Sequence, residues 1–180
     1  TGSLSRTAGE AVTMDDGSTV QVATGMMSFS PTVPGGTAVD VVYTEANVKT
    51  GPELPSTANG AVSLKVKDLN GADTEGTMTL DSGVNPTLGG DLTVQGHSIL
   101  DTSGNTITVN GDATITGLSE LSGGGTLVFS GGSSTHTLIG EIDFGDVEID
   151  QSDVDGPEVF IEQSDEANND IFFNALTVTR

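Results

Sequence analysis

The chain has 180 residues, 26 of them acidic and only 5 of them Lys or Arg, which gives a formal net charge of −21 at pH 7. A nucleic-acid-binding protein needs a basic face, so this class is excluded, and binding to an anionic membrane surface is disfavoured for the same reason. The sequence has no cysteine, which excludes disulfides, thiol catalysis and cysteine-held metal clusters. It has no apolar run of about 18 residues, so we expect no membrane insertion.

Composition predicts an all-β fold. The sequence contains 25 Gly and only 4% aromatic residues, whereas a helical bundle is typically rich in Ala, Leu, Glu and Lys. Many short strands joined by tight turns fit this composition. We therefore predict short antiparallel strands in sandwich-like or fibre-like modules, with a β-solenoid as the alternative.

The first predicted module covers residues 1–84. It begins with a small polar arm, residues 1–9, which a neighbouring molecule would have to order. Residues 37–44 alternate enough to form a strand, and residues 61–69 show the cleanest alternation of apolar and polar residues in the chain. A second run at 76–80 comes after a loop, so these last two runs are predicted to form a hairpin.

The second predicted module, residues 85–180, is an acidic chain of short β runs rich in Gly, Thr and Asp. Turn residues separate the runs at intervals of about ten residues. The runs are 92–100, 106–109, 113–116, 126–130, 135–139, 147–149, 159–161 and 171–178. Asn110-Gly111 suits the positive backbone angles of a type I′ turn, which favours a two-residue hairpin and antiparallel pairing here. Gly90-Asp91 and Gly111-Asp112 both precede alternating residues, but no fixed period emerges.

Acidic residues are concentrated in the back of the chain. Residues 68–179 hold 20 acids and no Lys or Arg, whereas residues 1–67 hold 6 acids and 4 basic residues. The more balanced front is expected to dock to a larger particle and the anionic back to project into solvent. The acidic run has two interpretations, a solvated face that blocks edge-to-edge strand pairing and a cation-dependent interface.

The sequence offers one specific candidate for chemistry, a calcium loop in residues 151–162 (QSDVDGPEVFIE). Asp153, Asp155 and Glu162 fall at ligand positions of the calcium-loop template, and calcium prefers such oxygen ligands. The first ligand position is Gln and neither flank is helical, so a helix–loop–helix site is not expected. A β-type calcium site would use Asp150, Asp153, Asp155 and Glu162. The alternative is a solvated Asp-Gly turn between two strands.

Catalysis is not expected. The two histidines, His97 and His136, stand alone in β or turn contexts, and no nucleophile-elbow pattern surrounds them. Paired carboxylates are abundant, as a glycosidase requires. One Tyr and no Trp, however, provide few aromatic platforms for a sugar-cleaving groove. No catalytic residue is therefore assigned.

Residues 85–99 (NPTLGGDLTVQGHSI) resemble a segment common in bacteriophage tail-fibre and related virion proteins. The matching residues are Pro86, Leu88, Gly89, Gly90, Asp91 and Leu92, and a Gly-containing turn comes after them. The resemblance implies a homotrimer without enzymatic activity. For a chain of this length it suits a capsid-decoration, head-fibre or tail-accessory protein better than a complete tail fibre.

These observations leave three function classes. The first is a non-enzymatic structural protein of a viral particle, located in the virion and assembling on larger virion proteins. The second is a secreted prokaryotic surface adhesin or fibre subunit, and the third is a carbohydrate-binding or carbohydrate-active module. The small apolar supply for many short strands predicts a homo-oligomer, because open strand edges would be closed between subunits.

Overall fold

The structure is a computed structural model of the chain. It describes residues 13–22, 32–50, 53–54, 61–67, 69, 74–116, 119–130, 135–139, 141–150, 158–162 and 171–179. In the last four of these ranges, side chains are described only for residues 146–149 and 176–178.

All of the secondary structure in the described residues is β, and the strands form two parallel sheets. The seven-stranded sheet contains β1 (Ser18–Val22), β2 (Ala38–Tyr43), β4 (Ala61–Lys67), β7 (Leu92–Gln95), β10 (Ala113–Ile115), β13 (Thr135–Ile139) and β15 (Glu158–Glu162). The nine-stranded sheet contains β3 (Val48–Lys49), β5 (Gly76–Thr79), β6 (Thr87–Leu88), β8 (Ser98–Asp101), β9 (Thr106–Val109), β11 (Glu120–Ser122), β12 (Thr126–Phe129), β14 (Glu141–Asp150) and β16 (Ile171–Thr179). In the part of the chain that the structure describes, no helix is long and apolar enough to span a membrane.

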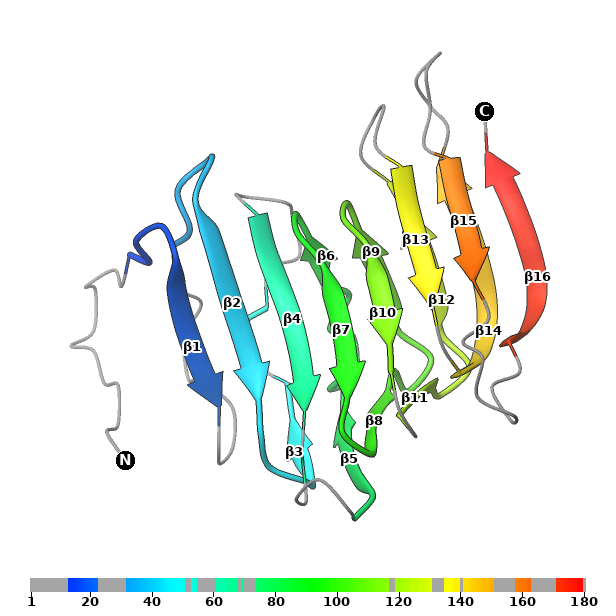
Figure 1. Cartoon of the computed structure of the whole chain (residues 1–180), viewed down its shortest axis with the longest axis horizontal. Helices are drawn as coiled ribbons and strands as arrows, with labels where there is room; N and C mark the ends of the chain where they lie inside the picture. The colour runs from blue at the N-terminus through cyan, green and yellow to red at the C-terminus, as the bar shows by residue number, and fades with distance from the viewer. Residues whose placement is uncertain are drawn as a thin grey trace.

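The two sheets are the walls of a β-solenoid of about 4 turns (Figure 1). One complete turn is β7, β8 and β9, and the next turn is β10, β11 and β12. Each strand pairs with its counterpart in the next turn, so that Leu92 is the Cα partner of Ala113, and Ile99 is the partner of Glu120. The all-β prediction is confirmed, and of the arrangements considered the molecule adopts the solenoid.

The nine-stranded sheet has two limbs that merge near the end of the chain. β5, β8 and β11 form one limb, and β6, β9 and β12 form the other. β14 is ten residues long and pairs with both limbs, through Glu141 with Glu120 and through Asp146 with Thr126. β16 then pairs along β14. The cross-section is therefore three-sided in the middle turns, and two of the sides become continuous in the last turns.

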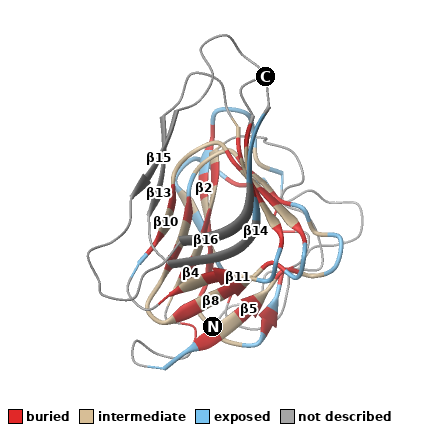
Figure 2. Cartoon of the chain, turned by 90° about the vertical axis from the view of Figure 1, so that its right-hand side faces the viewer, coloured by how far each residue is buried: buried red, intermediate tan, exposed pale blue. Residues whose placement is uncertain are grey.

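The core forms because alternate residues of each strand face the interior, where the aliphatic side chains of successive turns stack in columns. Figure 2 views the solenoid from the β16 end and shows the buried residues along the inner side of the strands. One column is Val41, Leu64, Leu92 and Ala113 on the seven-stranded sheet, and all four are buried. Burial of each large aliphatic side chain contributes about 1.5–3 kcal/mol.

Buried polar side chains join consecutive turns at the corners. Asn105 is buried, and its Nδ2 donates to the carbonyl oxygens of Thr102 (2.8 Å) and Asp81 (3.2 Å), while its Oδ1 accepts from the amide of Gly83 (3.0 Å). A buried amide with these partners is satisfied in its polar atoms, which is the condition for retaining it in an apolar core. The contacts to residues 81 and 83 fix the corner of one turn against that of the next.

The predicted hairpins are wrong. β9 and β10, on either side of Asn110-Gly111, belong to different sheets, and so do β4 and β5. Neither Asn110 nor Gly111 has a positive φ, so the type I′ turn is not formed. Glycine is required at 111 for space instead, because a Cβ there would lie 2.8 Å from the carbonyl atoms of Gly90 in the preceding turn. The Asn-Gly pair marks a corner at which the chain passes to another face.

The sheets run without a break across the boundary predicted between residues 84 and 85. β4 precedes this boundary and pairs directly with β7, which lies beyond it, through Leu64 and Leu92. The two segments also share one cluster of buried hydrophobic side chains. The division into modules stays a prediction from composition.

Candidate functional site

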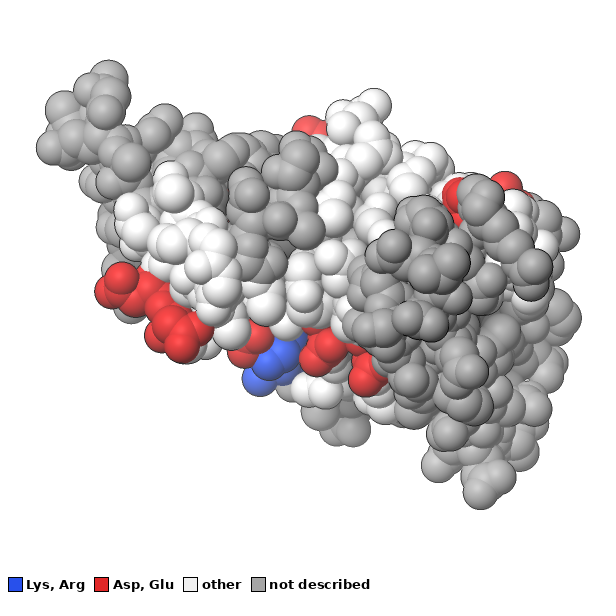
Figure 3. Space-filling model, turned by 90° about the horizontal axis from the view of Figure 1, so that it is seen from above, with Lys and Arg blue, Asp and Glu red and all other residues white. Residues whose placement is uncertain are grey.

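A row of polar side chains runs along the outer face of the seven-stranded sheet. It consists of Asp40 on β2, Ser63 on β4, and Asp91 and Asp112, which immediately precede β7 and β10. These residues face outward because their strand neighbours, such as Leu64, face the core. Figure 3 shows acidic side chains, with lysine among them, along this side of the molecule. We call these four residues the polar row.

Hydrogen bonds link the polar row from turn to turn. The amide of Asp91 donates to Ser63 Oγ at 3.0 Å, and the amide of Asp112 donates to Asp91 Oδ1 at 3.0 Å. Each of these side chains therefore accepts a hydrogen bond from the backbone that begins the next strand. The bond to the Asp91 carboxylate is charge-assisted, whereas the bond to the Ser63 hydroxyl is neutral. The local role of the row is to hold the corners of successive turns together.

The negative charges of the polar row outnumber the positive charge of the neighbouring Lys65. Lys65 on β4 forms an ion pair with Asp40, with 2.6 Å between Nζ and Oδ2, and both side chains are more than a third exposed. Such an exposed pair contributes little to stability. Asp91 and Asp112 occupy neighbouring turns, and strands in a sheet are about 4.8 Å apart. Two carboxylates at this separation repel each other by about 1 kcal/mol in water, and added salt screens this repulsion.

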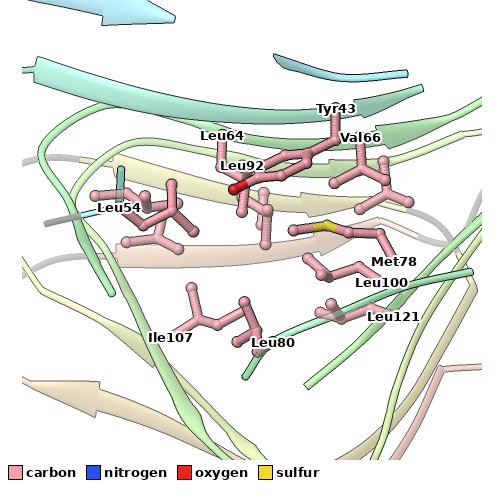
Figure 4. Packing of buried hydrophobic residues seen from close by; sticks show 14 of the residues in the cluster. Tyr43, Leu54, Leu64, Val66, Met78, Leu80, Leu92, Leu100, Ile107 and Leu121 are labelled. Atoms are coloured by element: carbon pink, nitrogen blue, oxygen red, sulfur yellow. The ribbon is translucent and has the colours of Figure 1, made fainter. Parts of the chain in front are cut away.

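A second polar feature lies inside the core. Tyr43 and Glu53 are only 0% and 2% exposed, and the Tyr43 hydroxyl donates a hydrogen bond to Glu53 Oε1. Figure 4 shows the Tyr43 ring among the aliphatic side chains of the core, where Val66 is its partner on the next strand. Burial raises the pKa of Tyr43 well above its usual range, and the charge of Glu53 and the hydrogen bond to it act in the same direction. Tyr43 is therefore a protonated donor at neutral pH and cannot serve as a base or nucleophile.

The histidines are separated in the fold. His97 lies in the turn between β7 and β8, where its φ is 57° and its carbonyl oxygen accepts the amide of Gly76 at 3.1 Å. His136 lies on β13, and its side chain is outside the described set. The neighbouring residues 133 and 134 are also outside it. In the structure, His97 contributes its backbone carbonyl group to a corner of the solenoid.

The predicted calcium ligands lie on two sheets and the segment between them. Asp150 is the last residue of β14, Glu162 is the last residue of β15, and Asp153 and Asp155 lie outside the described residues. β15 is an extended strand, so the backbone of Glu162 is about 13 Å along it from Glu158. Among side chains that the structure describes, no group of three or more His, Asp or Glu is placed to hold a metal ion. The calcium site stays a prediction.

The end of the solenoid presents a different kind of surface. Leu176 and Val178 on β16 are 48% and 47% exposed, and they are the large hydrophobic residues that stand out on the described surface. They pair in register with the buried Val147 and Ile149 of β14. They therefore continue two inward-facing core columns onto β16, where both side chains are exposed. In Figure 2 this part of β16 is seen as its exposed segment, nearest the viewer.

Comparisons with known proteins identify no relative. No family model matches the chain, and neither the curated proteins nor the solved structures contain a match.

Sequence reasoning missed three of these features. The repeat is visible in hydrogen bonds such as that from Asp112 to Asp91, which are 21 positions apart, although its length varies between turns, since Thr106 pairs with Thr126. The Gly-Asp pairs at 90 and 111 were its signal. The burial of Glu53 had no signal, because it lies in a Pro- and Gly-containing segment that reads as a solvent loop. The exposure of Leu176 and Val178 depends on whether another strand covers β16. The alternation of apolar and polar residues within a strand does not reveal this.

Proposed function

We propose that the chain is a non-enzymatic structural protein of a viral particle, which assembles on larger virion proteins as a capsid-decoration, head-fibre or tail-fibre component. The observation that carries this proposal is a pair of exposed apolar side chains on β16. A continuous apolar core reaches β16, where Leu176 and Val178 are about half exposed. Apolar residues that continue a core into solvent are characteristic of surfaces that other chains cover.

The segment that resembles virion proteins has a structural place in the fold. Residues 85–99 run from β6 through β7 into β8, across two corners of the solenoid. Leu88 and Leu92 are fully buried, and the Pro86 carbonyl oxygen accepts the amide of Thr108 in the next turn at 2.9 Å. These contacts support a role for the segment in building a rigid scaffold. The homotrimer remains the stoichiometry that the resemblance implies.

The alternatives differ in how far the surface supports them. A secreted surface adhesin or fibre subunit would use the same solenoid and would differ from a virion protein in its location outside the cell. A carbohydrate-binding module would need aromatic platforms, and Tyr43 and Phe129, the two aromatic residues with described side chains, are both buried. We therefore place the virion role first and the cell-surface role second.

The proposal is tested by locating the protein. Antibodies raised against the purified chain and coupled to gold would be applied to purified viral particles and to intact cells of the producing culture. We expect label on particles at a fixed position, and its loss when the gene is disrupted. Label confined to the cell surface would favour the adhesin or fibre subunit and overturn the virion assignment.

A further inference from the structure

The corner between β9 and β10 carries a chemically reactive pair of residues, Asn110 and Gly111. An Asn side chain loses its amide group when the backbone nitrogen of the next residue attacks the side-chain carbonyl carbon. Glycine in that next position leaves the attack unhindered, because it has no Cβ. The sequence holds three Asn-Gly pairs, at 59–60, 70–71 and 110–111, and the last of them lies within the described residues. Close contact with Gly90 in the preceding turn requires glycine at 111, so the spacing of the turns requires the residue that makes Asn110 reactive.

The fold occupies the atom that would attack. The amide of Gly111 donates to the carbonyl oxygen of Gly90 at 3.1 Å. The amides just before and just after it are held in the same way, by the Leu88 carbonyl oxygen at 2.9 Å and by Asp91 Oδ1 at 3.0 Å. Attack needs the Gly111 nitrogen to lose its proton and to direct its lone pair toward the Asn110 side chain. The bond to Gly90 must therefore break first, and the two flanking hydrogen bonds resist the rotation.

We propose that Asn110 is a deamidation site that the preceding turn of the solenoid keeps closed, so that it reacts only when this corner opens. In the open corner the deprotonated nitrogen of Gly111 forms a bond to Cγ of Asn110, and the side-chain nitrogen leaves as ammonia. Water then opens the five-membered imide at either of its two carbonyl carbons. One opening gives aspartate, and the other gives isoaspartate, in which the main chain runs through the former side chain. Asn110 is partly exposed, so water reaches it. The inference does not depend on the proposed virion role.

The isoaspartate product does not fit the closed corner. Its linkage adds one carbon atom to the main chain between residues 110 and 111. The backbone is held to the preceding turn on both sides of this point, since the Leu88 carbonyl oxygen accepts the amide of Asn110 and the Asp112 carbonyl oxygen accepts the amide of Leu92 at 2.8 Å. The lengthened segment has no room to bulge inward, because the contact with Gly90 does not admit even a Cβ. Refolding does not reverse the reaction, so the product is a lasting record that the corner has opened.

The first test compares the folded full chain with the same chain unfolded in urea, at one pH and one temperature. Samples taken over time are digested at low pH, and mass spectrometry of the peptides measures reaction at position 110 separately from the other two Asn-Gly pairs. We expect position 110 to react at least about a hundredfold more slowly in the folded chain, which corresponds to an opening free energy of about 2.8 kcal/mol. Equal rates would show that the preceding turn gives no protection. Absence of reaction in urea would show that Asn110 is not a deamidation site.

A variant in the preceding turn tests where the protection comes from. Asp91→Ala removes the oxygen that accepts the amide of Asp112, and it is too distant in sequence to change the chemistry of the unfolded chain. We expect reaction in the folded variant to be about three- to tenfold faster, with the rate in urea unchanged. The matched control is Asp101→Ala, which removes the acceptor of the Ser103 amide at a different corner. It should change the rate at position 110 by less than about twofold.

Equal acceleration in the two variants would overturn the proposal, because the reaction would then pass through unfolding of the whole chain and not through opening of this corner. The comparison of folded and unfolded wild-type protein decides whether the site is protected, whether or not either variant folds. Circular dichroism of each variant before ageing shows which of them is folded.

A refolding experiment tests the consequence of the reaction. Wild-type chains are aged in urea until part of position 110 has reacted, returned to native buffer, and separated by size exclusion into compact and expanded or aggregated fractions. Isoaspartate at 110 should be depleted from the compact fraction by at least about tenfold. Asn110→Asp keeps the normal main chain and should refold, which separates the added atom from the added charge. An equal share of isoaspartate in both fractions would show that the corner accommodates the longer chain, and the record of opening would then carry no structural effect.

Discussion

Gly111 and Gly90 lie against each other at the same corner of two successive turns. The amide of Gly111 donates to the carbonyl oxygen of Gly90 at 3.1 Å. A Cβ on Gly111 would stand 2.8 Å from both atoms of that carbonyl group, closer than side chains approach backbone in folded proteins. Two residues further along each strand, Leu92 pairs with Ala113, and this pairing holds the two glycine backbones close together. Glycine at 111 is therefore a requirement of turn-to-turn spacing.

Replacing Gly111 with Ala should destabilise the protein by about 1–3 kcal/mol, because the added methyl group forces two backbones apart. The matched control is Gly35→Ala, since nothing lies within 4 Å of a Cβ at that position and its φ is not in the left-handed region. We expect the control to stay within about 0.5 kcal/mol of the wild type. Urea unfolding followed by circular dichroism measures both, and equal stabilities would contradict the close-approach argument.

Tyr43 should resist ionisation until the protein unfolds. Its pKa is raised by burial, then by the charge of Glu53 and by their hydrogen bond. The native state therefore keeps a proton that the unfolded chain loses at about pH 10, so this contribution to stability is complete below that pH and is lost as the pH rises above it. Tyr43 is the only Tyr in a chain without Trp. Tyrosinate absorbance should consequently rise together with loss of the β signal in circular dichroism. Tyrosinate appearing near pH 10 in a folded protein would show that the hydroxyl is accessible.

Removing the Tyr43 hydroxyl should cost about 1–3 kcal/mol, because the buried Glu53 carboxylate loses one hydrogen-bond donor. Tyr43→Phe keeps the ring and tests this directly. In Glu53→Gln the same donor is lost from a neutral partner, so adding Tyr43→Phe to Glu53→Gln should cost less than Tyr43→Phe alone. Denaturant unfolding of the two single variants and the double variant forms a cycle, and purely additive effects would argue against coupling between the two groups.

Asp91 should show opposite effects for two small substitutions. Asp91→Asn keeps an oxygen that accepts the amide of Asp112 and removes a like charge, so we expect a stabilisation of up to about 1 kcal/mol at low salt. The gain should fall toward zero as NaCl approaches about 1 M. Asp91→Ala removes the acceptor and should destabilise. Thermal melts in both salt conditions measure the effect, and a loss of stability in Asp91→Asn would show that the charge itself is needed.

The melting temperature of the wild type should rise with NaCl between about 0.15 and 1 M, because 20 acids in residues 68–179 face no Lys or Arg in that stretch. If Asp153 and Asp155 belong to a calcium site, millimolar calcium should add a rise that NaCl of matched ionic strength does not give. Replacing both with Asn should then remove the calcium increment and keep the salt increment. Coincident melts in calcium and matched NaCl would assign these residues to a solvated turn.

The sequence predicted the strands better than their partners. The alternation at 61–69 and the run at 106–109 became β4 and β9, because the direction of a side chain relative to the core is a local property. Pairing is not local. Asn110-Gly111 has the composition of a hairpin turn, and only the position of Gly90 one turn earlier shows that the glycine is needed for close approach.

The repeat was hidden because its length varies between turns and because equivalent positions share the direction of their side chains and not their identity. Leu92 is matched one turn later by Ala113, and Asp101 by Ser122. At each equivalent position, the parallel sheet requires only that an inward-facing residue be apolar or that an outward-facing residue be polar. Several residue types satisfy each requirement. The insertions between β4 and β7 also lengthen the repeat, since Leu64 and Leu92 are 28 positions apart by their numbering.

The candidate site was predictable only where it depends on residue type. Acidic residues at Asp40, Asp91 and Asp112 are evident in the sequence, but their alignment into one row requires the register of the turns. The exposure of Leu176 and Val178 on β16 is not evident from alternation, because the same alternation is buried in β12.

The direction of the hydrogen bonds between turns has a mechanical consequence. Strands lie across the solenoid and bond only to the turn before and the turn after, so the bonds between turns are aligned with its long axis (Figure 1). Tension along that axis passes through every pair of neighbouring turns in series, because each turn is held only by its neighbours. The resistance of the solenoid to axial tension is therefore set by its most weakly paired neighbouring turns.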